Sequence, residues 1–114
     1  MFEINELFVD LYGCQGNLDD EKFLCRTLEE AAKNVNAKII KRITQRFSPT
    51  GVTVILILAE THISIHTWPE HGYAALDIFI CGEGKNPEPA WEAVRKALKP
   101  ESFKTNRLKR TVRV

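Results

Sequence analysis

The sequence lacks the features that mark several specialised classes of protein. Its cysteines, Cys14, Cys25 and Cys81, are odd in number and have no paired spacing, which argues against a disulfide framework. No apolar run approaches the roughly 20 residues of a membrane-spanning helix, and the N-terminal MFEINELF has no basic region of the kind that opens a secretory signal. We therefore expect a cytoplasmic protein with no membrane partner.

An excess of charge of one sign is also missing, because the formal net charge is only +1. A basic stretch does lie near the C-terminus, and nucleic-acid binding is one interpretation of it. Its cations alternate with apolar residues, however, as in an edge strand that is protected against pairing with another sheet. We favour the edge strand and expect no nucleic-acid partner. The cations are Lys104, Arg107, Lys109, Arg110 and Arg113.

With 114 residues and 44% hydrophobic content, the chain suits one domain over residues 1–114. The expected order of strand, helix, three strands, helix and strand predicts an α+β fold, a two-layer α/β sandwich with two helices on one face of an antiparallel sheet. The other sheet face is then bare, so we expect a homodimer in which a second copy covers it. The expected strands are 7–12, 37–47, 52–66 with an interruption near Glu60, 73–81 and 102–114, and the expected helices run from Asn17 or Asp19 to about residue 35 and from Asn86-Pro87 to Pro100.

The segment Leu58–Gly82, LAETHISIHTWPEHGYAALDIFICG, contains all three histidines and a cysteine. If residues 67–72 form the loop between two strands, His62 lies opposite Asp77, and paired residues share a face. A polar set then occupies the sheet face away from the helices, which is unusual for a purely structural surface. Thr61 has the wrong parity to join this set unless the strand bulges just before it. The set is His62, Ser64, His66, Tyr73, Asp77, Phe79 and Cys81.

Two chemistries compete for these residues. The histidines and Cys81 are ligand types for zinc, but their spacing matches no strong zinc pattern, and we expect no metal. Cys81 together with His66 has the composition of a nucleophile and its base, while a small buried hydrophobe explains a free cysteine equally well. The zinc set would be His62, His66, His71 and Cys81.

Phe47 and Glu70 lie in turns that contain proline. Phe47 can stack on a flat base or pack at the edge of the core. Glu70 can bind ribose hydroxyls or a cationic group, or be part of an ordinary hairpin loop. The residues alone leave both alternatives open.

Several motifs together resemble the prokaryotic, pyruvoyl-dependent S-adenosylmethionine decarboxylases. The specific ones are HTWPE at 66–70 and YAALD at 73–77, supported by LFVDLYGC at 7–14, FSPTG at 47–51 and Trp91 in the second helix. This chain has Glu6 where many relatives have histidine, and Thr61 where they have the serine that is processed.

The resemblance implies a proenzyme that cleaves itself between Glu60 and Thr61 and uses the new N-terminal carbonyl as an electron sink for decarboxylation. The covalent group is normally pyruvoyl, and threonine would yield 2-oxobutanoyl instead. The substrate would be S-adenosylmethionine, for spermidine biosynthesis, and the homodimer would contain two alpha and two beta chains. By the same resemblance, Thr61 becomes the keto-acyl group, His66 is the processing base, Thr53 assists processing, Cys81 is the catalytic acid, Phe47 stacks on adenine and Glu70 binds the ribose hydroxyls.

Two alternatives remain beside this interpretation. A relative with the same fold could decarboxylate arginine or another amino acid. Thr61 also allows an unprocessed, non-catalytic homologue that binds S-adenosylmethionine or a partner subunit, because its methyl group restricts χ1 and crowds the ester that processing requires.

Overall fold

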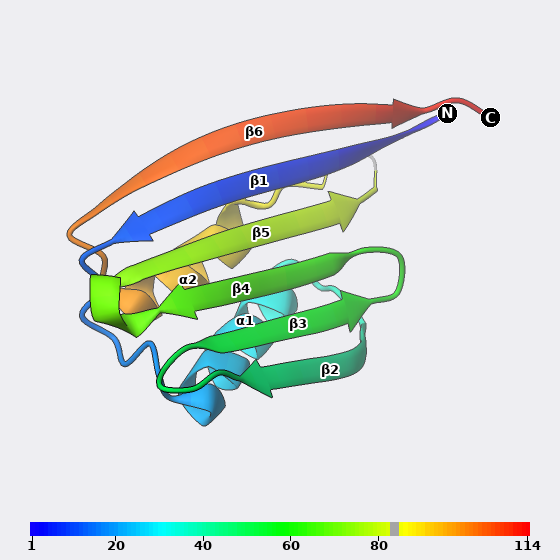
Figure 1. Cartoon of the computed structure of the whole chain (residues 1–114). Helices are drawn as coiled ribbons and strands as arrows, with labels where there is room; N and C mark the ends of the chain where they lie inside the picture. The colour runs from blue at the N-terminus through cyan, green and yellow to red at the C-terminus, as the bar shows by residue number, and fades with distance from the viewer. Residues whose placement is uncertain (83–84) are drawn as a thin grey trace.

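In the computed structural model, which describes residues 1–82 and 85–114, six strands form one antiparallel sheet and two helices cover one of its faces (Figure 1). The strand order across this described sheet is β2-β3-β4-β5-β1-β6. The predicted α+β sandwich is therefore confirmed. The elements are β1 (Phe2–Tyr12), α1 (Glu21–Asn34), β2 (Ile39–Arg46), β3 (Val52–Leu58), β4 (His62–Trp68), β5 (Tyr73–Cys81), α2 (Glu88–Leu98) and β6 (Ser102–Val112).

The interruption expected near Glu60 is confirmed, but the expectation of one strand over residues 52–66 is wrong, because the chain reverses at the interruption and forms the hairpin β3–β4. The Leu58 N–H donates to the Thr61 carbonyl at 2.8 Å and closes a tight turn at residues 59–61. Residues 54–59 are all apolar, apolar and polar residues alternate over 62–66, and no glycine or proline marks the turn, so the sequence pattern resembles one continuous strand. Thr61 consequently lies at a hairpin tip and not at a bulge.

The expected pairing of β4 with β5 is wrong by two residues. His62 lies opposite Phe79 and Ser64 opposite Asp77, because β4 continues to Trp68 and only the short 3-10 turn Pro69–His71 separates the strands. A shift of two residues leaves every side chain on the same face. The predicted division between a core face and a polar face of the hairpin is therefore correct.

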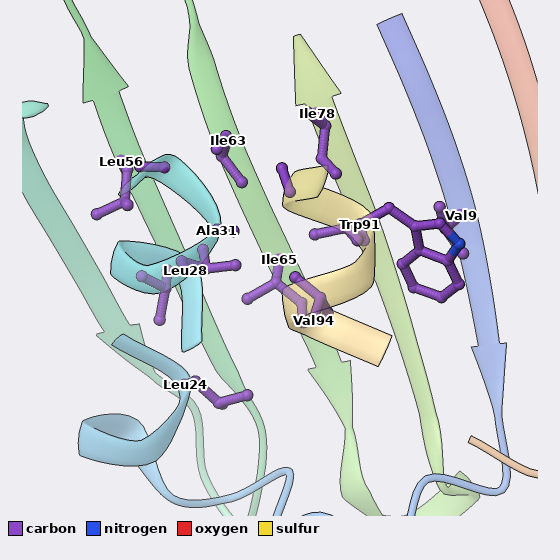
Figure 2. Close-up of a cluster of buried hydrophobic side chains, with 14 of the residues drawn as sticks. Val9, Leu24, Leu28, Ala31, Leu56, Ile63, Ile65, Ile78, Trp91 and Val94 are labelled. Atoms are coloured by element: carbon purple, nitrogen blue, oxygen red, sulfur yellow. The ribbon is translucent and has the colours of Figure 1, made fainter. Parts of the chain in front are cut away.

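The core lies between the helices and the sheet. Both helices direct an apolar stripe at alternate residues of the central strands, as Figure 2 shows. Neither expected cap, Asn17 or Asp19, begins helix α1, because the Asp20 side chain accepts from the Phe23 N–H at 3.0 Å and is the N-cap. Likewise α2 begins at Glu88, and Asn86 accepts from the Glu88 N–H at 3.0 Å. The labelled core residues are Val9, Leu24, Leu28, Ala31, Leu56, Ile63, Ile65, Ile78, Trp91 and Val94.

No described element covers the other sheet face, and large apolar side chains are exposed on it. An exposed apolar patch of this kind is typical of an interface. Strand β6 lies at one edge of the sheet, as its basic pattern predicts. Neither α1 nor α2 is long and apolar enough to cross a membrane. The exposed apolar residues of this face include Phe2, Tyr12, Ile43, Ile57, Trp68 and Leu108.

Candidate active site

The β3–β4 turn and the end of β5 together form the first group of candidate residues. Because β4 and β5 are antiparallel, the start of β4 lies beside the end of β5, and Thr61 comes close to Cys81. Thr61 is half-buried. A cavity of about 180 Å³ opens here, lined by Asn36, Ala37, Lys38, Leu58, Ala59, Glu60, Thr61, Ile80, Cys81 and Lys85.

The Cys81 thiol in this cavity is kept in its protonated form. Burial raises the pKa of Cys81 most, and the negative charge of Glu60 raises the pKa further, against a smaller lowering by Lys85. A thiol with a raised pKa is a poor nucleophile at neutral pH. The environment of Cys81 therefore favours a proton donor over the nucleophile that its pairing with a histidine would require.

A second group lies at the other end of the same hairpin. His66 and Thr53 face each other across β3 and β4, and Thr53 Oγ1 lies 2.8 Å from His66 Nδ1. The Phe47–Gly51 turn and Glu70 complete a cavity of about 300 Å³ beside them. The Phe47 side chain is 53% exposed, so its ring is available for stacking and is not part of the core edge.

One copy of the chain does not bring the two groups together. Five residues of extended chain separate Thr61 from His66, which corresponds to about 16 Å. Cys81 and His66 are separated by a similar length of β5, because His66 lies opposite Ala75. The Cys81–His66 nucleophile pair is therefore not formed within one copy.

The zinc hypothesis receives no support from the described residues. Among residues 1–82 and 85–114, no group of three or more His, Cys, Asp or Glu residues could hold a metal ion. The His62 ring instead packs against Phe79, with 5.2 Å between the ring centroids.

A third polar group lies in the middle of the bare sheet face; sequence reasoning placed Tyr73 and Asp77 on this face but missed Asp10. The Tyr73 hydroxyl donates to the Asp10 carboxylate, and this hydrogen bond, with burial, raises the pKa of Tyr73 to about 12. Burial also raises the pKa of Asp77, against opposing effects of His62 and His66. Asp10 and Asp77 share a cavity of about 180 Å³. Asp10 alternates with buried residues of β1, and this pattern could have placed it on the bare sheet face.

Comparison with known proteins shows the family of the chain. The family model described as "S-adenosylmethionine decarboxylase" matches residues 5–111. The chain belongs to this family. It is 52% identical over 92 residues to an S-adenosylmethionine decarboxylase proenzyme of Synechococcus sp., with 80% of this chain and 72% of that protein covered. It is 49% identical over 105 residues to the proenzyme of Methanococcus aeolicus, with 91% and 90% covered.

A solved member of the S-adenosylmethionine decarboxylase family has the same fold. The crystal structure of the adenosylmethionine decarboxylase from Aquifex aeolicus superposes with a TM-score of 0.90 and 32% identity, over 99% of this chain and 94% of that one. The helix-covered sheet is therefore the architecture of the family.

The S-adenosylmethionine decarboxylase family implies a covalent pyruvoyl-type group, and the residues at the hairpin tip fit such a group. Thr61 carries the hydroxyl from which a keto-acyl group can form. It borders a cavity that also contains a protonated thiol and a lysine, Lys85. These neighbours can supply a proton and a positive charge beside an electron-accepting carbonyl.

Proposed function

We propose that this chain is an S-adenosylmethionine decarboxylase proenzyme that cleaves itself between Glu60 and Thr61 and then serves spermidine biosynthesis. The observation that carries the proposal is the position of Thr61. It is a hydroxyl residue at a half-buried hairpin tip, beside the protonated Cys81 thiol. The whole arrangement belongs to a chain that matches the family over residues 5–111.

Cleavage uses the chain's own groups. The Thr61 hydroxyl oxygen attacks the Glu60 carbonyl carbon, and the peptide C–N bond breaks as the Thr61 nitrogen takes up the proton, which leaves an ester. A base then removes the Thr61 Cα proton, the bond between Thr61 Cβ and the ester oxygen breaks, and Glu60 leaves with a new main-chain carboxylate at its C-terminus. Hydrolysis with loss of ammonia gives a 2-oxobutanoyl end, because threonine has one methyl group more than serine.

In decarboxylation the covalent group and the side chains around it have different roles. The keto-acyl group supplies the electron sink that decarboxylation needs. Cys81 donates the proton that replaces carbon dioxide on the substrate carbon. Phe47 stacks on the adenine and Glu70 accepts hydrogen bonds from the ribose hydroxyls, which orients the substrate.

The separation of the two groups of residues supports a homodimer. The bare sheet face carries exposed apolar side chains, and a second copy can bury them. A two-fold axis that lies between two such faces and runs across the strands brings the Thr61 end of one copy opposite the His66 end of the other. Each complete site then combines Glu60, Thr61 and Cys81 with Thr53, Phe47, His66 and Glu70 of the partner subunit.

Intact-mass measurement and an assay of labelled carbon dioxide test this proposal. We expect two fragments with the break after Glu60, and release of carbon dioxide from S-adenosylmethionine by the cleaved sample. Thr61→Val removes the hydroxyl and should stay whole, while Thr61→Ser should cleave faster and leave a group lighter by one methylene.

A second candidate function rests on the Thr61 methyl group, which crowds the ester. If the chain remains whole after long incubation and Thr61→Ser remains whole as well, the chain is a non-catalytic homologue that binds S-adenosylmethionine or a partner subunit. Release of carbon dioxide from arginine and not from S-adenosylmethionine would instead indicate a decarboxylase of a basic amino acid.

A further inference from the structure

Thr67 is a buried polar residue beside the cavity that Phe47 and Glu70 also line. It is only 6% exposed, and its hydroxyl makes hydrogen bonds to two other segments of the chain. We propose that Thr67 is a positioning residue, whose hydroxyl holds the turn at residues 47–51 against β4 and so sets the shape of the substrate cavity. The proposal rests on the substrate-binding roles proposed above for Phe47 and Glu70.

The Thr67 hydroxyl uses both its donor and its acceptor capacity. Its oxygen accepts from the Val52 N–H at 2.9 Å, and its proton is donated to the Leu18 carbonyl at 2.7 Å. The Val52 carbonyl is a more distant acceptor, at 3.2 Å. One side chain of β4 thus joins the start of β3 to the segment that precedes α1.

The hydroxyl acts where the backbone pairing of β3 with β4 ends. The last pair at this end is Thr53 with His66, and Val52 lies one position beyond it. The hydrogen bond from the Val52 N–H to the Thr67 side chain therefore continues the attachment of β3 to β4 past the last backbone pair. Because Val52 is fully buried, loss of this acceptor would leave its N–H without a partner, which costs free energy.

The turn at residues 47–51 is joined directly to this attachment point. The Phe47 N–H donates to the Gly51 carbonyl at 2.9 Å and closes the turn, and Val52 is the next residue. Gly51 has a φ of +117°, and a Cβ there would lie 3.2 Å from the Thr67 carbonyl, so glycine lets the turn approach β4 closely. Release of Val52 would loosen this approach and allow the Phe47 ring to move.

The Leu18 carbonyl is a fixed partner for the Thr67 hydroxyl. Leu18 is 4% exposed and belongs to the core. The segment before it is attached to the end of α2, because the Gln15 N–H and the Gly16 N–H both donate to the Leu98 carbonyl at 3.0 Å. The hydroxyl therefore connects the turn at residues 47–51 to the helix layer.

Kinetic constants should show this role as a change in binding. The adenine and the ribose do not react, so contacts with Phe47 and Glu70 are as strong in the ground state as in the transition state, and their loss raises KM with little effect on kcat. Thr67→Val keeps the shape of the side chain and removes the hydroxyl. It should raise KM for S-adenosylmethionine about tenfold, with kcat changed by less than about twofold. Thr67→Ser retains a hydroxyl and should restore most of the affinity.

Amide hydrogen exchange tests the hydrogen bond without substrate. In the uncleaved Thr61→Val chain, measured by NMR, the Val52 amide should exchange slowly, because it donates to the buried Thr67 hydroxyl. Adding Thr67→Val should accelerate this exchange at least about tenfold relative to core amides, and Thr67→Ser should keep it slow.

Thr27 is a matched control, because it is equally buried, at 5% exposed, and its hydroxyl donates to the Phe23 carbonyl at 2.8 Å within α1. Whatever change in the free energy of unfolding Thr27→Val causes, the relative exchange of Val52 and KM should stay at the parent values. Equal increases of KM in the two valine variants, or a Thr67→Ser variant that behaves like Thr67→Val, would overturn the proposal.

The two measurements also distinguish this role of Thr67 from the proposed function. Fast exchange of Val52 in the Thr61→Val chain itself would overturn the role of Thr67 without any substitution at that position. If exchange changes as expected while no preparation releases carbon dioxide from S-adenosylmethionine, the proposed function fails and the hold of Thr67 on the turn stands. If wild type releases carbon dioxide and Thr67→Val leaves KM unchanged, the inference about Thr67 fails alone.

Discussion

Thr53 Oγ1 lies 2.8 Å from His66 Nδ1, at directly opposed positions of β3 and β4. This hydrogen bond fixes the ring orientation of the imidazole, and in the tautomer whose Nδ1–H donates to Thr53 Oγ1 the Nε2 atom is free to act as a base. The two side chains are therefore in contact in a chain that contains no bound substrate. They lie on the bare sheet face, where a second copy is expected.

Loss of the Thr53 hydroxyl should impair self-cleavage more than stability. We expect Thr53→Val, which preserves shape, to slow cleavage by about 10- to 100-fold, because a base held in the wrong orientation transfers protons poorly. Thr53→Ser retains the hydroxyl and should restore most of the rate. The fraction of cut chain against time, by intact mass, measures the effect. Equal rates for Thr53→Val and Thr53→Ser would contradict the proposed role.

The proposed homodimer predicts complementation between two inactive variants. His66→Ala removes the base and Thr61→Val removes the hydroxyl, so neither variant should cleave alone. In a mixed dimer, the His66→Ala copy still has Thr61 and faces an intact His66 of the partner subunit. We expect cleavage in co-expressed mixtures, and only of the His66→Ala chain.

Mass spectrometry distinguishes the two chains, because each substitution changes the mass of a different fragment. A mixture in which both chains stay whole, while size measurements show dimers, would mean that the site is not assembled across the two copies. Cleavage of His66→Ala alone would remove His66 from the processing chemistry altogether.

The fold was largely predictable because the apolar and polar residues within each helix and strand already show which face is buried. Alternation along 73–81 gives β5 with its observed bounds, Tyr73–Cys81, and the apolar stripes of both helices identify the covered face. The hairpin tip at residues 59–61 was not predictable in the same way. It lacks glycine and proline, and a backbone hydrogen bond from Leu58 N–H to the Thr61 carbonyl defines it.

The sequence motifs indicate candidate site residues, but they do not give the arrangement of these residues. The motifs indicate Thr61, His66 and Cys81, yet the distance of Cys81 from the other two depends on the pairing of β4 with β5, which sequence periodicity does not reveal. The cavity that Glu60 and Cys81 both line also requires the turn to be placed correctly. A site that combines two copies, as proposed, is not visible in the pattern of one chain.

The Tyr73–Asp10 hydrogen bond predicts a loss of stability in alkaline solution. The pKa of Tyr73 is raised to about 12 in the folded chain, against about 10 for an ordinary tyrosine. Between these pH values the unfolded chain releases the phenolic proton and the folded chain keeps it. The free energy of unfolding should therefore decrease as pH rises from about 10 to about 12.

Denaturant unfolding at a series of pH values measures this slope, and Asp10→Asn provides the comparison. That variant removes the charge which opposes phenolate formation, so its slope over the same range should be shallower. Ultraviolet titration of the phenolate should place the Tyr73 ionisation of Asp10→Asn closer to pH 10. Identical slopes in the two proteins would show that the Asp10 carboxylate does not hold the phenolic proton.

Asp19 should control substrate affinity although it does not line the cavity beside Phe47 and Glu70. Its carboxylate accepts from the Gly51 N–H at 2.9 Å and contacts the Arg46 guanidinium at 3.5 Å, which fixes the turn that carries Phe47. We expect Asp19→Ala to raise KM for S-adenosylmethionine about tenfold with little change in kcat, which is the effect of losing one hydrogen bond of about 1.4 kcal/mol. Asp19→Asn keeps an accepting oxygen and should retain most of the affinity.

Asp20 is a matched control for Asp19, because it is the adjacent acidic residue and its contacts differ: it caps helix α1. Its side chain accepts from the Phe23 N–H at 3.0 Å, and Asp20→Ala should reduce the free energy of unfolding by about 1 kcal/mol. Since this cap does not contact the Phe47 turn, KM should stay near the wild-type value. If both alanine variants raise KM equally, the effect is one of general stability, and Asp19 has no specific part in holding the turn.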